Sequence, residues 1–339
     1  MAGCRRMTAA TVTQSKETTF WVVTRRARSA PQARPSLPGG ARSSGRPTSR
    51  STEPMQSVSF DPELLKAHTR EQWDRAAEGW YEKRDLIRAW LREPTRAMLD
   101  LAAIGPGACV LDVAAGAGDQ TLDIADRVGP SGHVLATDIS QSILQFAREN
   151  ALQAGFTNVD VQVADGERLD VAPIFDAAVC RLGLMFYPDP LGGLREMRRA
   201  LKPEGRACTL VFSEPAANPC ITILVATALK HVRGQLSDPF RPGGLLSLGR
   251  PGHIEALFEQ AGFTSVRTVK MGAPMMLPSS SHYLDFIRTS AGPILQLLEP
   301  LGEAAKEAAW SDMTAQLDQF NRTSEWVGPN ELLLTVGIR

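Results

Sequence analysis

The sequence predicts an α/β fold in which a mostly parallel sheet is covered by helices on both faces. Short runs that are apolar throughout, or rich in β-branched residues, recur along the chain, and the intervals between them have the spacing of amphipathic helices. Continuously apolar strands are typical of sheets buried on both faces, and helical crossovers are the connections that parallel strands need. A chain of 339 residues can form one large domain with extensions.

The first 54 residues do not share this pattern. They hold ten Lys or Arg against two acids and are rich in Ser, Pro and Gly. Such a composition cannot bury a core, so we expect residues 1–54 to be a disordered basic extension. A transit segment, which would direct the protein to the mitochondrial matrix, and an upstream extension ahead of a true start at Met55 remain alternatives. The remaining residues carry 27 bases and 35 acids, which argues against a nucleic-acid partner.

A helical cap is expected over residues 55–105, with the helical pattern starting at Asp61. One helix face collects Trp73, Ala76, Ala77, Trp80 and Tyr81, which fall at i, i+3, i+4, i+7 and i+8. A face of this kind either packs on the core or covers a ligand.

Seven strands follow the cap. They are expected at 108–113, 133–139, 159–165, 175–182, 205–212, 263–271 and 331–339. Helical periodicity fills the intervals between the first five strands, as at 141–155, and a helical insert at about 272–330 separates the last two. The longest apolar run, Ile221 to Leu229, is about half the length of a membrane span, so we expect a buried helix there and no span.

A glycine-containing turn follows the first strand in "VLDVAAGAGDQT", residues 110–121. Gly116 and Gly118 lack Cβ atoms, so a ligand can approach the backbone N–H groups closely. The nicotinamide fingerprint wants a third glycine where Thr121 stands, and the Gly-Lys-Ser/Thr of a P-loop is absent. A nicotinamide-dependent oxidoreductase on a similar fold is kept as the first alternative.

Acids stand at the ends of three successive strands. Asp112 directs a negative charge at the turn, which suits a cationic ligand and repels a pyrophosphate. Asp138 can accept both hydroxyls of a ribose, Ile139 offers an apolar face to a purine, and Asp165 can accept a hydrogen bond from an exocyclic amine. Each acid alone could be a helix cap or a turn residue. Together, on the carboxyl edge of a parallel sheet, they favour a ligand with a ribose, an adenine and a positively charged tail.

S-adenosylmethionine has these three features, and the residues resemble the class I S-adenosylmethionine-dependent methyltransferases, in particular the group similar to the ubiquinone/menaquinone-biosynthesis enzymes. The matching stretches are "VLDVAAGAGDQT", "ATDIS", "VADGERL", "FDAAVCRLGLMF" and "EMRRALKPEGR", between about residues 108 and 213. The departures are Ala115 and Ala117 in the turn, where the group commonly has Cys and Thr, and Glu204 in place of a glycine.

The resemblance implies a Rossmann-like, seven-stranded, mostly parallel sheet over residues 106–339, with an antiparallel last strand, an N-terminal helical cap and a C-terminal helical insert. It also implies the cofactor-binding residues. Asp112 and the backbone of Ala114, Gly116 and Gly118 would hold the amino-acid end, Asp138 with Ile139 the ribose and base, and Asp165 with Gly166 the adenine, while Arg181 would border both cofactor and acceptor.

The implied reaction is transfer of a methyl group to a small, largely apolar acceptor, by C- or O-methylation of a quinol-like or phenol-like molecule. Apolar lining is expected from "LGLMFYPDP", Leu182 to Pro190. Tyr81 and Arg181 are positional candidates for orienting the acceptor. The pattern names no catalytic base among His231, His253 and His282, and no metal site.

A non-catalytic partner subunit that keeps the methyltransferase-like fold is the second alternative. The five cysteines show no CxxC pair, which is typical of a reducing compartment, so a cytoplasmic location is expected. The sequence makes no prediction about the oligomeric state.

Overall fold

The computed structural model describes residues 61–234 and 238–339. The expected basic extension at 1–54 and the first six residues of the expected cap lie outside the described residues. No helix in the described part combines the length and the apolar character needed to cross a bilayer.

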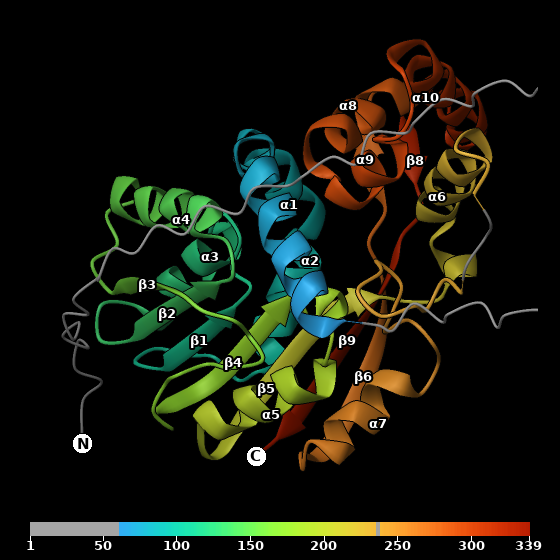
Figure 1. Ribbon diagram of the computed structural model, residues 1–339. Helices are drawn as coiled ribbons and strands as arrows, with labels where there is room; N and C mark the ends of the chain where they lie inside the picture. Colours follow the sequence, from blue (N-terminus) through green and yellow to red (C-terminus); the bar gives the residue numbers. More distant parts are fainter. Residues whose placement is uncertain (1–60, 235–237) are drawn as a thin grey trace, which may run out of the picture. The chain divides into compact units, whose positions relative to one another are not determined.

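The described residues form the predicted seven-stranded sheet (Figure 1). Its strands are β1 (Cys109–Val113), β2 (His133–Asp138), β3 (Val159–Val163), β4 (Phe175–Arg181), β5 (Leu201–Phe212), β6 (Thr264–Gly272) and β9 (Glu331–Ile338). The order is β3-β2-β1-β4-β5-β9-β6, in which β1 to β5 run parallel and β9 runs antiparallel to β5 and β6. The predicted antiparallel last strand is thereby confirmed, and it lies inside the sheet.

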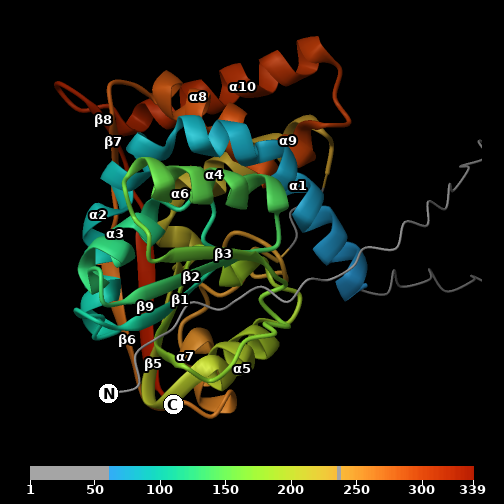
Figure 2. The same ribbon diagram turned by 90° about the vertical axis from the view of Figure 1, so that its left-hand side faces the viewer.

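Helices cover both faces of the sheet, as predicted (Figure 2). One face carries α2 (Arg84–Leu101), α3 (Asp119–Val128) and α4 (Gln141–Gln153), and the other carries α5 (Pro190–Ala200) and α7 (His253–Gln260). In α2, Ile87, Leu91 and Met98 are fully buried at spacings of four and seven residues, which place them on one helix face. This apolar stripe is what holds the helix against the sheet.

A further group of helices lies beyond the carboxyl ends of the parallel strands (Figure 1). It consists of α1 (Pro62–Glu82), α6 (Pro219–His231), α8 (Ser280–Ser290), α9 (Gly292–Leu298) and α10 (Glu303–Leu317). Helix α1 begins at Asp61, whose side chain accepts the backbone N–H groups of Glu63 and Leu64, with Pro62 in the first turn. The apolar run forms helix α6, as expected, and Ile221, Leu224, Thr227 and Ala228 are its buried residues.

The insert between the last two strands of the sheet is not wholly helical, which corrects the prediction. It begins with β7 (Met275–Leu277) and ends with β8 (Trp326–Gly328), and these two strands pair antiparallel. Trp326 fixes the ribbon: its ring is buried and stacks on Tyr283, and its Nε1 donates to the carbonyl of Leu317 at 2.8 Å. Three-residue strands are too short to show a period of two in the sequence.

Candidate functional site

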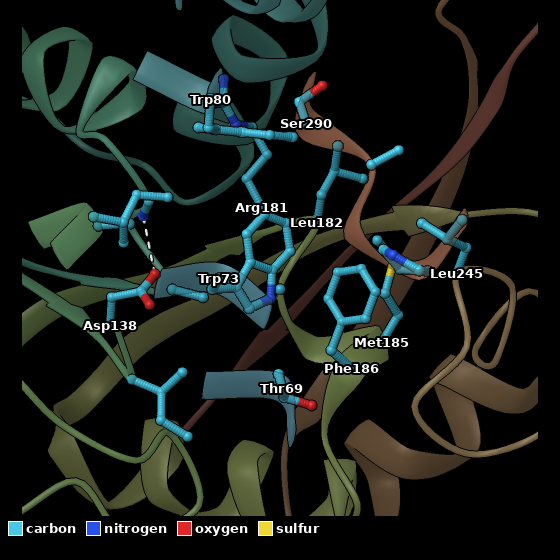
Figure 3. A pocket seen from close by; sticks show the side chains of 18 of the residues that line it. Thr69, Trp73, Trp80, Asp138, Arg181, Leu182, Met185, Phe186, Leu245 and Ser290 are labelled. Atoms are coloured by element: carbon cyan, nitrogen blue, oxygen red, sulfur yellow. Dashed lines mark hydrogen bonds between the residues drawn. The ribbon is translucent and has the colours of Figure 1, made fainter. Parts of the chain in front are cut away.

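A large cavity opens at the carboxyl ends of β1, β2 and β4, beneath α1 and the insert. Its volume is about 1540 Å³, counting the space at its open mouth. Figure 3 shows Asp138 on one side of it, Leu245 and Met185 on the opposite side, and Trp73 between them.

The glycine-containing turn forms part of the wall. Ala114 and Gly116 line the cavity, and both have left-handed backbone, with φ of 55° and 60°. Gly118, with φ of 85°, does not line the cavity. It begins α3, and a Cβ there would lie 2.9 Å from the Cα of Ala147 in α4. Gly118 thus has a packing role that brings α3 close to α4, and its expected contact with a ligand stays a prediction.

Asp138 ends β2 and faces the cavity from beside this turn. Its Oδ2 accepts the backbone N–H of Gly116 at 3.0 Å, and its Oδ1 accepts that of Ser140 at 3.0 Å (Figure 3 shows the first bond). Burial raises the pKa of Asp138 to about 6, although the backbone N–H donors favour the charged form and lower the pKa. Ile139 lines the cavity next to it, so an acceptor of hydroxyl groups and an apolar surface lie side by side.

Asp165 and Gly166, at the end of β3, also line the cavity. Asp165 Oδ1 accepts the backbone N–H of Glu167 at 2.9 Å, and its Oδ2 accepts Lys66 Nζ of α1 at 2.9 Å. A Cβ on Gly166 would overlap the hydroxyl of Tyr187, so only glycine leaves room for that ring in the wall.

Asp112 does not line the cavity, and its expected contact with a cationic ligand stays a prediction. Its carboxylate is fully buried and accepts the Thr121 hydroxyl at 2.6 Å and the side-chain amide of Gln120. Burial raises the pKa of Asp112 to about 7, although the bond from Thr121 lowers it. Asp112 thus holds the first turn of α3 against β1, and Gln120 stands between Asp112 and the cavity.

Arg181 ends β4, is buried, and lines the cavity as expected. Its guanidinium donates to Thr95 Oγ1 at 2.8 Å and to the carboxylate of Asp119. The charge of Arg181 is therefore balanced by a buried acid at the start of α3.

The opposite side of the cavity is apolar. The segment after β4 contributes Leu182, Met185 and Phe186, as predicted. The insert and α6 add a second wall, made by Ile221, Leu224, Tyr283, Phe286, Ile287 and Ile294.

The aromatic residues on this face of α1 have two different surroundings: some line the cavity, and one packs against α4. Trp73 and Trp80 line the cavity and contact each other edge to face at 5.4 Å between ring centroids, and Trp73 also meets Phe186 at 5.6 Å. Tyr81 lies outside the cavity wall and stacks on Phe146 of α4 at 4.4 Å. Its expected role in orienting an acceptor stays a prediction.

None of the three histidines considered from the sequence lines the cavity. His231 contacts Asp312 at 3.2 Å, His282 contacts Ser279 at 2.8 Å, and His253 begins α7.

Sequence reasoning missed several residues of the wall, among them Lys66, Asp119, Gln120 and Tyr283. A signal existed for Lys66, because it lies seven residues before Trp73 and so belongs to the helix face that continues to Trp80. No local signal marks Tyr283, which reaches the site only through the folding of the insert.

Part of the chain matches a family of known proteins. Residues 104–238 match the family model of a methyltransferase domain. This stretch of the chain is therefore similar to methyltransferase domains, which confirms the resemblance seen in the sequence.

The similar curated proteins belong to one group within this class. The ubiquinone/menaquinone biosynthesis C-methyltransferase UbiE of Hahella chejuensis is 35% identical over 164 residues, which cover 46% of this chain and 64% of the relative. The protein of the same name from Ectopseudomonas mendocina is 39% identical over 138 residues, 40% of this chain and 52% of the relative. The matched region thus spans less than two thirds of these relatives.

Among solved structures, the YcgJ protein from Bacillus subtilis aligns with a TM-score of 0.49 at 18% identity, over 73% of this chain and 98% of that chain.

Proposed function

We propose that this chain transfers a methyl group from S-adenosylmethionine to a small, largely apolar acceptor, by C- or O-methylation. The placement of Asp138 carries the proposal: a buried carboxylate, fixed by two backbone N–H groups, lies between a glycine turn and an apolar surface. Hydroxyl groups of a ribose are suitable partners for such a carboxylate.

The residues of the wall fit this cofactor in kind and in order. Asp138 would take the ribose hydroxyls, Asp165 the adenine amine against Ile139, and the backbone of Ala114 and Gly116 the amino-acid end. Bound here, the cofactor supplies a methyl group on a positively charged sulfur.

The chain's own contribution to the reaction is positioning and the exclusion of water. A sulfonium that meets a neutral or anionic nucleophile disperses its charge, so an apolar chamber favours the reaction, and orientation alone contributes several kcal/mol. Trp73, Phe186 and the walls from α6, α8 and α9 supply that chamber. Arg181, already paired with Asp119, borders it and is proposed to orient a polar group of the acceptor.

The names of the curated relatives bear on the acceptor. They refer to C-methylation in ubiquinone and menaquinone biosynthesis. An aromatic, quinol-like acceptor agrees with the apolar side of the cavity, and we propose this class for the first trials. The cytoplasmic location stays a prediction.

Two measurements test the proposal. In the first, the full chain is incubated with S-adenosylmethionine labelled on the methyl group and with quinol precursors, phenols and amines in turn; transfer to a quinol or phenol is expected. In the second, calorimetry measures S-adenosylhomocysteine binding. Asp138→Ala should weaken binding by about 1–3 kcal/mol, because the ribose hydroxyls lose their hydrogen-bond acceptor. The control Asp126→Ala, on the exposed side of α3, should leave the affinity unchanged.

The alternatives give different results. Binding of a nicotinamide dinucleotide in place of S-adenosylhomocysteine would favour an oxidoreductase. Binding of S-adenosylhomocysteine without transfer to any acceptor class would favour a non-catalytic subunit.

A further inference from the structure

Lys66 of α1 joins two acids at the nucleobase end of the cavity. Its Nζ lies 2.9 Å from Asp165 Oδ2 and 2.6 Å from Glu167 Oε2, and all three residues line the cavity. The side chains are only 16%, 29% and 11% exposed, in that order, so this is not a surface ion pair of negligible strength.

The cluster extends into the loop between β3 and β4 and to the start of α5. Glu167 Oε1 accepts the backbone N–H of Asp189 at 2.8 Å, and its own N–H is bound to Asp165 Oδ1. Both acids therefore have fixed orientations. A carboxylate has about four lone-pair sites, so Asp165 keeps acceptor capacity for a ligand amine while it binds Lys66.

Helix α1 is also tied down at a second point on the cofactor side. Asp74 Oδ1 accepts the Ser140 hydroxyl at 2.6 Å and the backbone N–H of Ser142 at 3.3 Å. Thr69 and Trp73, which line the cavity, lie between this tie and Lys66.

On the insert side, two glycines allow close approach of α1. A Cβ on Gly79 would overlap the carbonyl of Thr289 in α8, and a Cβ on Gly292 would overlap the side chain of Gln72. These contacts involve the middle and later turns of α1. Its first turns are held by the ion pairs of Lys66 and by Leu65, which packs beside Gly243.

We propose that Lys66 is a positioning residue of the nucleoside site: it orients Asp165 for the nucleobase amine and fastens the first turns of α1 across that end of the cavity. Only the identity of the nucleoside rests on the proposed function. The fastening is a property of the ligand-free chain.

The charge on Lys66 is stable. Burial by itself lowers the pKa of Lys66, but the hydrogen bonds to Glu167 and Asp165 outweigh it and the net shift is upward. The fastening should therefore respond to salt, which screens ion pairs, and not to pH near neutrality.

The first experiment follows S-adenosylhomocysteine dissociation by stopped-flow tryptophan fluorescence, which Trp73 and Trp80 in the wall should report. Lys66→Met keeps an unbranched, apolar side chain that is one atom shorter, and it removes the charge. We expect about tenfold faster dissociation. Lys66→Arg should stay within about threefold of wild type, since it keeps the charge. Lys230→Met is the matched control and should change nothing: it removes the exposed ammonium of Lys230 on α6 from its ion pair with Asp312 of α10.

The salt dependence of dissociation distinguishes an effect of the Lys66 charge from an effect of its packing. Added salt should speed dissociation from wild type more than from Lys66→Met. Wild-type kinetics in Lys66→Met, or kinetics in Lys66→Arg as fast as in Lys66→Met, would overturn the proposal. Glu167→Gln weakens the same cluster from the other side and should speed dissociation in the same direction.

The second experiment needs no ligand, so it still applies if the proposed function fails. Hydrogen exchange of the ligand-free chain should be faster in residues 62–70 of Lys66→Met than in wild type, with the later turns of α1 unchanged. Equal exchange in the two proteins would overturn the fastening even if S-adenosylhomocysteine binds.

Discussion

At the scale of single residues, we expect ligand binding to depend most on the ionised carboxylate of Asp138. Burial raises its pKa to about 6, so the protonated form becomes populated in mildly acidic solution. A protonated carboxyl loses acceptor capacity for ribose hydroxyls, so S-adenosylhomocysteine affinity should be constant at neutral pH and fall as the pH drops through about 6. Calorimetry across this range measures it. Asp138→Asn should bind weakly without this pH dependence, and a flat profile for wild type would contradict the ribose assignment.

Gly118 makes a second prediction at this scale, concerning stability. The φ of Gly118 is 85°, and a Cβ added there would lie only 2.9 Å from the Cα of Ala147, so the position excludes a side chain. Gly118→Ala should lower the free energy of unfolding by about 1–3 kcal/mol in urea titration. Gly105→Ala is the matched control, because a Cβ there meets nothing within 4 Å. Similar losses in both variants would show that the turn is not constrained as described.

The residues found from the sequence are those whose position follows from the topology. Asp138, Asp165 and Arg181 follow successive strands, and parallel strands bring their carboxyl ends to one edge. The orientation of a side chain is less predictable. Asp112 lies in the expected strand, but its side chain points to Thr121. Lys66 binds an acid 99 residues away, and no local pattern encodes such a pair.

At the scale of elements, the hydrophobic periodicity and the length of each helix or strand determined whether it could be predicted. The seven strands of the sheet are long enough to read from apolar runs, whereas β7 and β8 have three residues each. The same limit applies to the function of the aromatic face of α1. Its spacing predicts one helix face, but only the packing shows that Trp73 and Trp80 meet the cavity while Tyr81 meets α4.

The insert gives the prediction that belongs to this scale. Ile287 of α8 is buried and forms part of the apolar wall. Ile287→Ala removes contact with an apolar acceptor, so the KM for the acceptor should rise about tenfold, as expected for the loss of a few methylene contacts. The affinity for S-adenosylhomocysteine, measured in the same preparation, should not change. A parallel loss of both would show that the insert does not form a separate acceptor wall.

At the scale of the whole molecule, we propose that the described chain folds without residues 1–54. The buried core cluster runs from Ile87 to Val336 and is continuous across the sheet and the helices on both faces. Deletion of residues 1–54 should leave the urea midpoint and the affinity for S-adenosylhomocysteine unchanged. Loss of cooperative unfolding in the shortened chain would show that the first residues contribute to the fold.

The architecture also explains why two chemically different chambers share one cavity. The parallel strands end in acids and a glycine turn on one side, and the insert with α6 supplies apolar side chains on the other. Helix α1 contacts both α4 and α8, so it borders the polar and the apolar side. A cationic methyl donor and an apolar acceptor can thus be held in contact.

The most direct measurement is a crystal structure of the full chain with S-adenosylhomocysteine bound. The ribose hydroxyls should lie within hydrogen-bonding distance of Asp138, the base should lie against Ile139 with its amine toward Asp165, and the sulfur should face the apolar side. A nucleoside bound outside this cavity, or with its ribose away from Asp138, would contradict the assignment of the site.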